Sequence, residues 1–452
     1  MKYRFLSILF LLSLGTMHAQ DKTYKFTLNE AVEFAMDSSY ATANARRDIA
    51  IAIKKRWETA TRGLPQINAD VSYTNNLKQP VQLIPGEFFG GDPGTFIPVT
   101  FGTKQQMSAV ATLDQLLFDG SYIVALQASK TYLEFSENQA EKTALETRKA
   151  VIEAYGNVLL AEETVEIFEK NKKVLEDNVF ETKKIYENGL TELESVEQLQ
   201  ITLSQVENRL NNAERMVGIT KELLKLALGI ELKNELILED DLESLAQENI
   251  SLTILNNEWN IQDNIDYQLA ENLTEQRELE LKLEKSRALP TLSAFINYGT
   301  AAYGEDFDFF ESDQEWFQSS VFGVNLNIPI FSSLQRSSRT QQAKIELEKA
   351  KIQFTQTRDQ IQLELKRAQS NYEFAIESYQ TAQNNLELAQ RIANRNEIEF
   401  GEGLATSFEL RQAQTQLYTA QQEYLQTMLD IINAKAELES ILNTPKINID
   451  NQ

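Results

Sequence analysis

Residues 332–400 read SSLQRSSRTQQAKIELEKAKIQFTQTRDQIQLELKRAQSNYEFAIESYQTAQNNLELAQRIANRNEIEF, without one proline or glycine. Proline breaks the interior of a helix, and glycine weakens it by about 1 kcal/mol. The stretch is instead rich in Ala, Leu, Glu, Gln, Lys and Arg, which are good helix formers. We therefore predict one continuous helix, which at about 1.5 Å per residue would be on the order of 100 Å long. A helix of this length is not expected in an ordinary globular domain.

Two other stretches have the same character. Residues 121–228 contain no proline, and residues 404–444 contain neither proline nor glycine. In the first of these, apolar residues recur at spacings of three, four and seven: Val151, Tyr155, Val158, Val165, Phe168, Leu175, Val179 and Tyr186. This spacing is typical of a coiled-coil seam with polar residues on the other helix faces. It predicts helices that pack sideways against long partners.

The two halves of the chain contain the same features in the same order. Each half has a Leu-Pro pair, two strand-like runs, a junction with a phenylalanine, and a long helix that ends in Gly-Leu. Phe118 and Phe331 are 213 residues apart, and Leu190 and Leu404 are 214 apart. The second offset also relates Gln198 to Gln412, Gln200 to Gln414, and Leu203 to Leu417. A constant offset of this kind predicts a tandem duplication.

The strand-like runs alternate between apolar and polar residues. The alternation is clear in residues 67–74 and 322–330, and weaker in residues 107–113 and 292–298. Such runs of about ten residues suit strands that cross a bilayer with one face to lipid and the other to a lumen. On pattern alone, a soluble sheet with one buried face fits equally well. Evidence of export favours the membrane interpretation.

The evidence of export lies at the N-terminus, where residues 1–20 have the form of a signal peptide. Lys2 and Arg4 precede an apolar stretch that is too short to span a membrane, and Ala19 offers a cleavage site. No later run reaches the ~18 apolar residues of a membrane helix, so a mature chain that enters a membrane must do so in a closed β-barrel. Four strands cannot close a barrel, because at least about eight are needed. Two chains would supply eight strands and three would supply twelve.

Composition excludes most enzyme classes. The chain has no Cys, and its one His is His18, which lies in the predicted signal peptide. Ser-His-Asp and Cys-His sites and zinc sites built on Cys or His are therefore excluded. The net charge of -24 opposes nucleic-acid binding, which depends on Lys and Arg. We predict that the protein is not an enzyme, and that it needs no cofactor and no metal.

The predicted fold class is mainly α with a small β part, in which long antiparallel helical hairpins carry four strands per chain. The predicted organisation begins with a signal peptide over 1–20 and a first repeat over 21–229, which contains a helix, a strand hairpin at 66–118 and a helical hairpin at 121–228. An inter-repeat equatorial segment with short elements follows over 230–262. The second repeat, over 263–444, contains a helix, a strand hairpin at 290–331 and a helical hairpin at 333–443, and a tail over 445–452 ends the chain.

Across essentially the whole mature chain, this order of features resembles the TolC-like outer membrane efflux proteins. The resemblance rests on the duplication, on Leu-Pro before each first strand, on the Phe-Asp-Gly-Ser junction at residues 118–121, and on the helix turns at residues 186–191 and 400–407. It implies a homotrimer in the outer membrane, with a twelve-stranded barrel and a periplasmic α-barrel of twelve helices. It also implies passive conduction, with a periplasmic adaptor protein and an inner-membrane pump as partners.

The same resemblance assigns functional residues to the helix turns. The adaptor-docking tips correspond to Gly189, Leu190 and Thr191 in the first turn, and to Gly403, Leu404, Ala405 and Thr406 in the second. An acidic gate of the periplasmic mouth corresponds to Glu409, whereas Gln412 departs from the pattern where a second acidic residue can occur. Without the resemblance, the two glycines are helix C-caps that permit positive φ, and Glu409 is a solvated helix residue.

Other interpretations stay open at this point. A non-conducting, oligomeric coiled-coil protein of the cell envelope, with a structural or adhesive role, would share the helices and the strands. The acidic residues 304–313 offer oxygen ligands but lack the spacing of a calcium-binding EF-hand loop, so a surface loop is preferred. Residues 80–98 are predicted to be an extracellular loop. The sequence does not identify the transported compound, or whether the pump exports drugs, metals or protein.

Overall fold

The computed structural model describes residues 22–256 and 259–444. The predicted signal peptide and C-terminal tail lie outside the described residues. Most described residues are helical and a minor part forms strands, as predicted. The chain divides into two compact units, which are described separately. The helical unit comprises residues 22–49, 136–271 and 354–444, and the sheet unit comprises residues 50–135 and 272–353.

The long helices have the extent that their composition predicts. Helix α4 runs over Gly120–Glu187, and α8 runs over Gln335–Gly401. Each is followed, after a short turn, by a helix of 36 residues: α5, Leu193–Leu228, and α9, Ser407–Leu442. Helices α5 and α9 begin and end 214 residues apart, and both have a left-handed C-cap, Gly229 and Asn443.

The predicted seam is buried over most of its length. Val151, Tyr155, Val158 and Leu175 have no exposed surface, and Phe168 is also buried, whereas Tyr186 near the turn is exposed. Two apolar clusters hold the helical unit together. The larger one joins α4, α5, α8 and α9 to α2, Leu28–Ser38, and the smaller one lies between the four long helices alone.

Short elements lie between residues 230 and 263, and the pairing of one of them with an N-terminal strand was not predicted from the sequence. Strand β6, Glu235–Leu238, pairs in parallel with β1, Thr23–Phe26. Helix α6, Leu242–Glu248, and the 3-10 helices η2, Leu252–Asn256, and η3, Ile261–Asp263, follow.

Tyrosine hydroxyls from the long helices fix this segment. Tyr155 donates to Phe26 O at 3.0 Å or Asp240 Oδ2 at 2.9 Å, and Tyr372 accepts from the N–H of Ser251 at 2.8 Å. The segment is therefore attached by buried polar contacts as well as by apolar packing.

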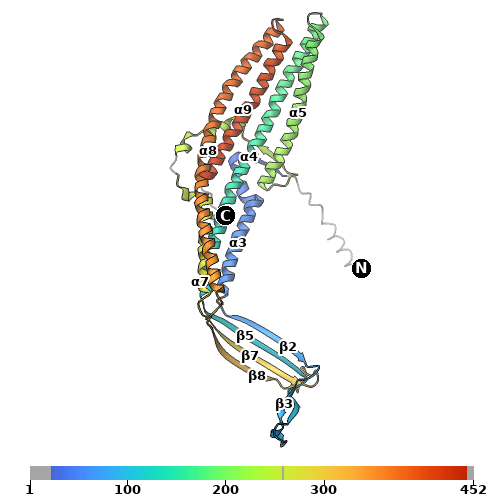
Figure 1. Cartoon of the computed structure of the whole chain (residues 1–452). Coiled ribbons are helices and arrows are strands. Elements are labelled where there is room, and N and C mark those ends of the chain that lie inside the picture. The colour runs from blue at the N-terminus through green and yellow to red at the C-terminus, as the bar shows by residue number, and fades with distance from the viewer. Residues whose placement is uncertain (1–21, 257–258, 445–452) are drawn as a thin grey trace, which may run out of the picture. The chain divides into compact units, whose positions relative to one another are not determined.

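The sheet unit is built on one antiparallel sheet. Its strands are β2, Gln66–Asn75, β5, Gln105–Asp119, β7, Thr291–Gly304, and β8, Phe317–Asn327. Their order is β2-β5-β7-β8, so β2 and β8 are the edge strands, and the outer edge of each has no strand partner among the described residues. The four strands lie side by side in a curved sheet (Figure 1). Residues of α3, Tyr40–Thr61, of α7, Ile265–Ser286, and of the starts of α4 and α8 complete the unit.

The register gives the sheet one apolar face and one more polar face. Across all four strands, Ile67, Leu113, Ile296 and Phe322 lie opposite one another. One residue further along, the row is Asn68, Thr112, Asn297 and Val321. Because side chains alternate between the faces of a sheet, the two rows belong to opposite faces.

The structure differs from the predicted strands in two places. The last run was predicted to continue to Ile330, but β8 ends at Asn327, because Pro329 has no N–H to donate to a ladder. Ser333 and Leu334 then have positive φ, and α8 begins at Gln335 rather than at residue 333. The predicted loop at residues 80–98 contains a second small sheet, formed by β3, Val81–Pro85, and β4, Phe96–Thr100, with the 3-10 helix η1, Gly86–Phe89, between them.

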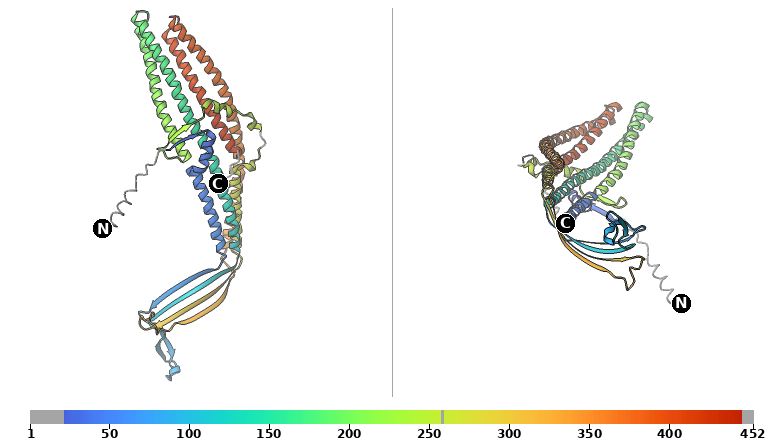
Figure 2. Two further views of the ribbon diagram at one scale, coloured as in Figure 1. Left: turned by 180° about the vertical axis from the view of Figure 1, so that it is seen from behind. Right: turned by 60° about the horizontal axis from the view of Figure 1, so that its bottom comes forward.

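This β3–β4 hairpin extends from the end of the sheet that is remote from the helices of the sheet unit (Figure 2). Among the described residues, no helix is both long enough and apolar enough to cross a membrane.

Candidate functional site: the two helix turns

The first turn joins α4 to α5 and closes α4 with a Schellman motif. The N–H of Gly189 donates to Tyr186 O at 2.8 Å, and the N–H of Leu190 donates to Ile185 O at 3.1 Å. Gly189 has a φ of 76°. This left-handed conformation is open to glycine at little cost, which explains the residue at this position.

The second turn, between α8 and α9, has the same hydrogen bonds. The N–H of Gly403 donates to Phe400 O at 3.0 Å, and the N–H of Leu404 donates to Glu399 O at 2.7 Å. Gly403 has a φ of 73°. Both turns lie at the same end of the helical unit (Figure 1). The sequence likeness of the two turns is therefore also a likeness of backbone geometry.

Each turn presents one leucine to solvent. Leu190 is 79% exposed and Leu404 is 74% exposed. No atom lies within 4 Å of where a Cβ of Gly189 or Gly403 would be, so the turns are open on this side as well. Each exposed leucine is therefore an apolar contact point without a partner among the described residues.

Glu409 has a defined local role in the structure. Its carboxylate accepts from the N–H of Thr406 at 2.8 Å and from the Thr406 hydroxyl at 2.9 Å. The Thr406 hydroxyl in turn accepts from the N–H of Glu409 at 3.2 Å, which completes a capping box at the start of α9. The Thr406 N–H and hydroxyl hold the pKa of Glu409 below its ordinary value. Glu409 is thus ionised and oriented by its own helix.

The two turns differ in how the next helix begins. The N-cap of α5 is Glu192, whose side chain makes no capping bond. Thr191 instead donates to the Ser195 hydroxyl at 3.4 Å, and Ser195 lies 3.1 Å from the hydroxyl of Ser407 in α9. A hydroxyl pair therefore links the starts of α5 and α9 close to the turns.

The packing behind the turns is unusually polar. Asn171 in α4 donates to Gln421 in α9 at 2.9 Å, and both Asn178 and Thr182 are buried. Gln414, two residues beyond the exposed Gln412, is only 4% exposed, and its Oε1 has no hydrogen-bond partner. Polar groups that are buried without partners contribute less to cohesion than apolar packing does. This polar packing was not predicted, although Asn171 and Asn178 lie at positions of the predicted seam and indicate it.

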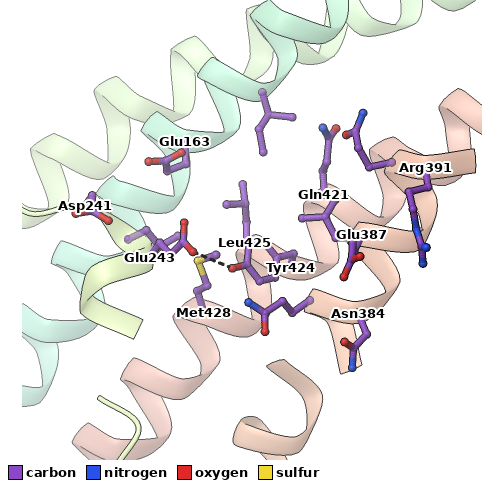
Figure 3. A pocket seen from close by; sticks show the side chains of 15 residues that line it. Glu163, Asp241, Glu243, Asn384, Glu387, Arg391, Gln421, Tyr424, Leu425 and Met428 are labelled. Carbon is purple, nitrogen blue, oxygen red and sulfur yellow. Dashed lines mark hydrogen bonds between the residues drawn. The ribbon is translucent and has the colours of Figure 1, made fainter. Parts of the chain in front are cut away.

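A groove of about 770 Å³ lies further along the helical unit, between α4, α6, α8 and α9. Glu163, Asp241 and Glu243 gather on one side of it, and Glu387 and Arg391 lie on another (Figure 3). Burial, together with the charges of Glu166, Asp241 and Glu243, raises the pKa of Glu163. The groove has acidic lining and was not predicted, because residues far apart in the sequence form it.

The acidic loop at residues 304–313 packs through its aromatic residues. Phe309 is 2% exposed, and its ring lies 6.0 Å from that of Tyr73 and 5.6 Å from that of Phe307, edge to face in both pairs. Across the described residues, no three Asp, Glu or His side chains are placed to hold a metal ion. The loop is therefore organised by ring packing.

Comparisons with known proteins bear on the family and the fold of the chain. A family model described as outer membrane efflux protein matches residues 41–230 and 261–444. No curated protein sequence matches the chain significantly.

Solved structures share the fold at low sequence identity. CusC is 16% identical with a TM-score of 0.73, covering 92% of this chain and 92% of its own. VceC of Vibrio cholerae is 16% identical with a TM-score of 0.70, covering 92% and 95%. The CmeC channel of Campylobacter jejuni is 16% identical with a TM-score of 0.71, covering 92% and 85%.

Proposed function

The chain belongs to the outer membrane efflux protein family, and from this premise we propose that it is the outer-membrane duct of a tripartite export system. The family consists of channel proteins rather than enzymes and is located in the outer membrane, with a periplasmic helical extension. In the proposed mechanism, an inner-membrane pump drives the substrate, and this protein supplies a water-filled path to the exterior. Conduction through the duct itself is passive.

The observation that carries the proposal is the four-stranded sheet with two open edges. An edge strand presents a row of unpaired N–H and C=O groups, which cannot face lipid without a large cost. Each chain contributes four strands to this sheet, fewer than the eight or so that close a membrane barrel. Pairing β2 of one copy with β8 of the next removes every edge, and three copies then supply twelve strands.

The two faces of the sheet support this assembly. The row of Ile67, Leu113, Ile296 and Phe322 suits contact with lipid, and the row that begins with Asn68 suits a lumen. In a single chain, Ile67 is 72% exposed and Phe322 is 68% exposed. Large apolar side chains are not expected to face water on a sheet with open edges. Their exposure therefore favours a membrane-embedded barrel over a soluble sheet.

The helix turns are the proposed docking points for the periplasmic adaptor. The exposed Leu190 and Leu404, on turns of equal geometry, offer equivalent apolar contacts in the two halves of each chain. We place the adaptor contacts at residues 189–191 and 403–406 and an acidic gate at Glu409. Opening would be a separation of the helix ends near the turns, which the polar packing between them makes less costly.

Single-channel recording of the purified oligomer in a planar bilayer tests the proposal. Stable, ohmic conductance steps are expected, because a water-filled barrel conducts ions without recognising them. A protein that gives no conductance and is recovered in a soluble fraction would instead be the non-conducting envelope protein, and the duct would be excluded.

A further inference from the structure

The β3–β4 hairpin is apolar on both of its faces. Because directly paired residues share a face, one face carries Val81, Leu83, Pro85, Phe96, Pro98 and Thr100, and the other carries Gln82, Ile84, Ile97 and Val99. A hairpin on the surface of a protein usually has one polar face. This hairpin has none.

Most of these side chains are uncovered in the single chain. Leu83 is 65% exposed and Phe96 is 61% exposed, and at the tip Phe88 is 79% exposed. Between residues 81 and 100 the only charged residues are Glu87 and Asp92, and both lie in the turn rather than on the strands. A two-stranded hairpin is marginally stable alone in water, and a contiguous apolar surface marks an interaction site.

The hairpin lies beside the edge of the sheet at which copies of the chain would meet. It continues from β2, the edge strand that the next copy has to pair, and returns to the sheet through β5. At its base, the N–H of Asn76 donates to Lys104 O at 2.8 Å, which joins the hairpin to the β2–β5 pair. Every copy in a barrel would therefore carry its hairpin at the same end, beside the junction with its neighbour.

We propose that the β3–β4 hairpins of neighbouring copies pack against one another and form a closed apolar collar at the outer end of the barrel. In a ring of identical subunits each copy meets one neighbour on either side through different surfaces. Two apolar faces on one hairpin match that arrangement, because one face contacts the preceding copy and the other contacts the following copy. Because the charged residues of the hairpin lie only in its turn, contacts between the strands of neighbouring hairpins bring no like charges together. The inference rests on the proposed oligomeric duct.

Cysteine cross-linking in isolated outer membranes tests the collar, because the chain has no cysteine of its own. The double variant L83C/I97C places one thiol on each face of the hairpin. With a short bismaleimide, most of this variant is expected to shift into bands of two or more copies. The single variants L83C and I97C are expected to lose most of that shift, because each lacks the thiol that faces the neighbour. V81C/V99C repeats the test at a second pair, should the first pair disturb folding.

A matched pair on the sheet edges separates the collar from the barrel. Ser72 in β2 and Ser319 in β8 lie on the same face as Asp70, at the two open edges. S72C/S319C is expected to cross-link if copies pair edge to edge. Cross-linking of this pair without cross-linking of either hairpin pair overturns the collar and leaves the duct intact, with lipid or another protein covering the hairpin. Failure of the edge pair as well overturns both.

Discussion

At the scale of single residues, Glu409 is where a structural role and a proposed functional role meet. Its carboxylate closes a capping box with Thr406, and it is also the residue proposed to form an acidic ring in the oligomer. Three such carboxylates would repel one another and attract cations. Substitution by glutamine distinguishes the two roles, because glutamine also serves at the third position of a capping box.

We expect E409Q to retain the thermal stability of the parent protein, because the amide oxygen still accepts from Thr406. If Glu409 forms a gate, E409Q changes the single-channel conductance and its inhibition by divalent cations. E409A, the matched control, loses both the charge and the cap, and its melting temperature falls. Unchanged conductance and cation sensitivity in E409Q would show that Glu409 is only a helix cap.

The same carboxylate gives a stability contribution that depends on pH. The pKa of Glu409 is lowered in the folded chain from its ordinary value of 4.5. Stability from this group is therefore fully present above pH 4.5 and is lost as the pH falls through the lower, folded-state pKa. The difference in melting temperature between the parent protein and E409Q is expected to change only on the acid side of pH 4.5.

At the scale of elements, the helix turns are set by backbone geometry rather than by side-chain contacts. Gly403 has positive φ and no neighbour near its missing Cβ, whereas Gly401 ends α8 and is equally open but lacks the positive φ. The two glycines, two residues apart, therefore isolate the effect of conformation. Space is not limiting at either position.

We predict that G403A destabilises the protein by about 1–2 kcal/mol, the cost of a left-handed conformation for an L-residue. G401A is expected to be neutral, or stabilising by up to about 1 kcal/mol, because alanine is the better helix former. Chemical denaturation of the two variants measures both changes. A loss of stability in G401A as large as that in G403A would contradict the role of positive φ.

The long elements and both turns could be predicted from the sequence, because their signals are local. The absence of proline indicated α4, the absence of both proline and glycine indicated α8, and Gly189 and Gly403 marked the two turns. The pairing of β1 with β6 could not be predicted, since Thr23 meets Glu235 more than two hundred residues away.

The β3–β4 hairpin escaped prediction for a different reason. Its prolines and glycines are typical of an irregular loop, yet Pro85 and Pro98 are accommodated in a two-stranded sheet that has only edges. The acidic groove was missed because it depends on how four helices are placed in register. Apolar spacing predicts that helices pack, but it does not predict this register.

At the scale of the whole molecule, a single chain leaves several surfaces incomplete. The edges of β2 and β8 lack partners within the described chain, most of the apolar row across the sheet is exposed, and both faces of the β3–β4 hairpin carry exposed apolar side chains. A rotation that places identical copies side by side would give the strand edges their partners and bring the apolar surfaces of neighbouring copies together. The proposed duct therefore needs an assembly of several copies, and its pore would be a property of that assembly.

The central claim is that several chains share one barrel, and native mass spectrometry of the protein extracted from the outer membrane in detergent tests it most directly. The account predicts a single dominant species with three times the mass of the mature chain. A species with the mass of one chain, stable at the same protein concentration and in the same mild detergent, would contradict it.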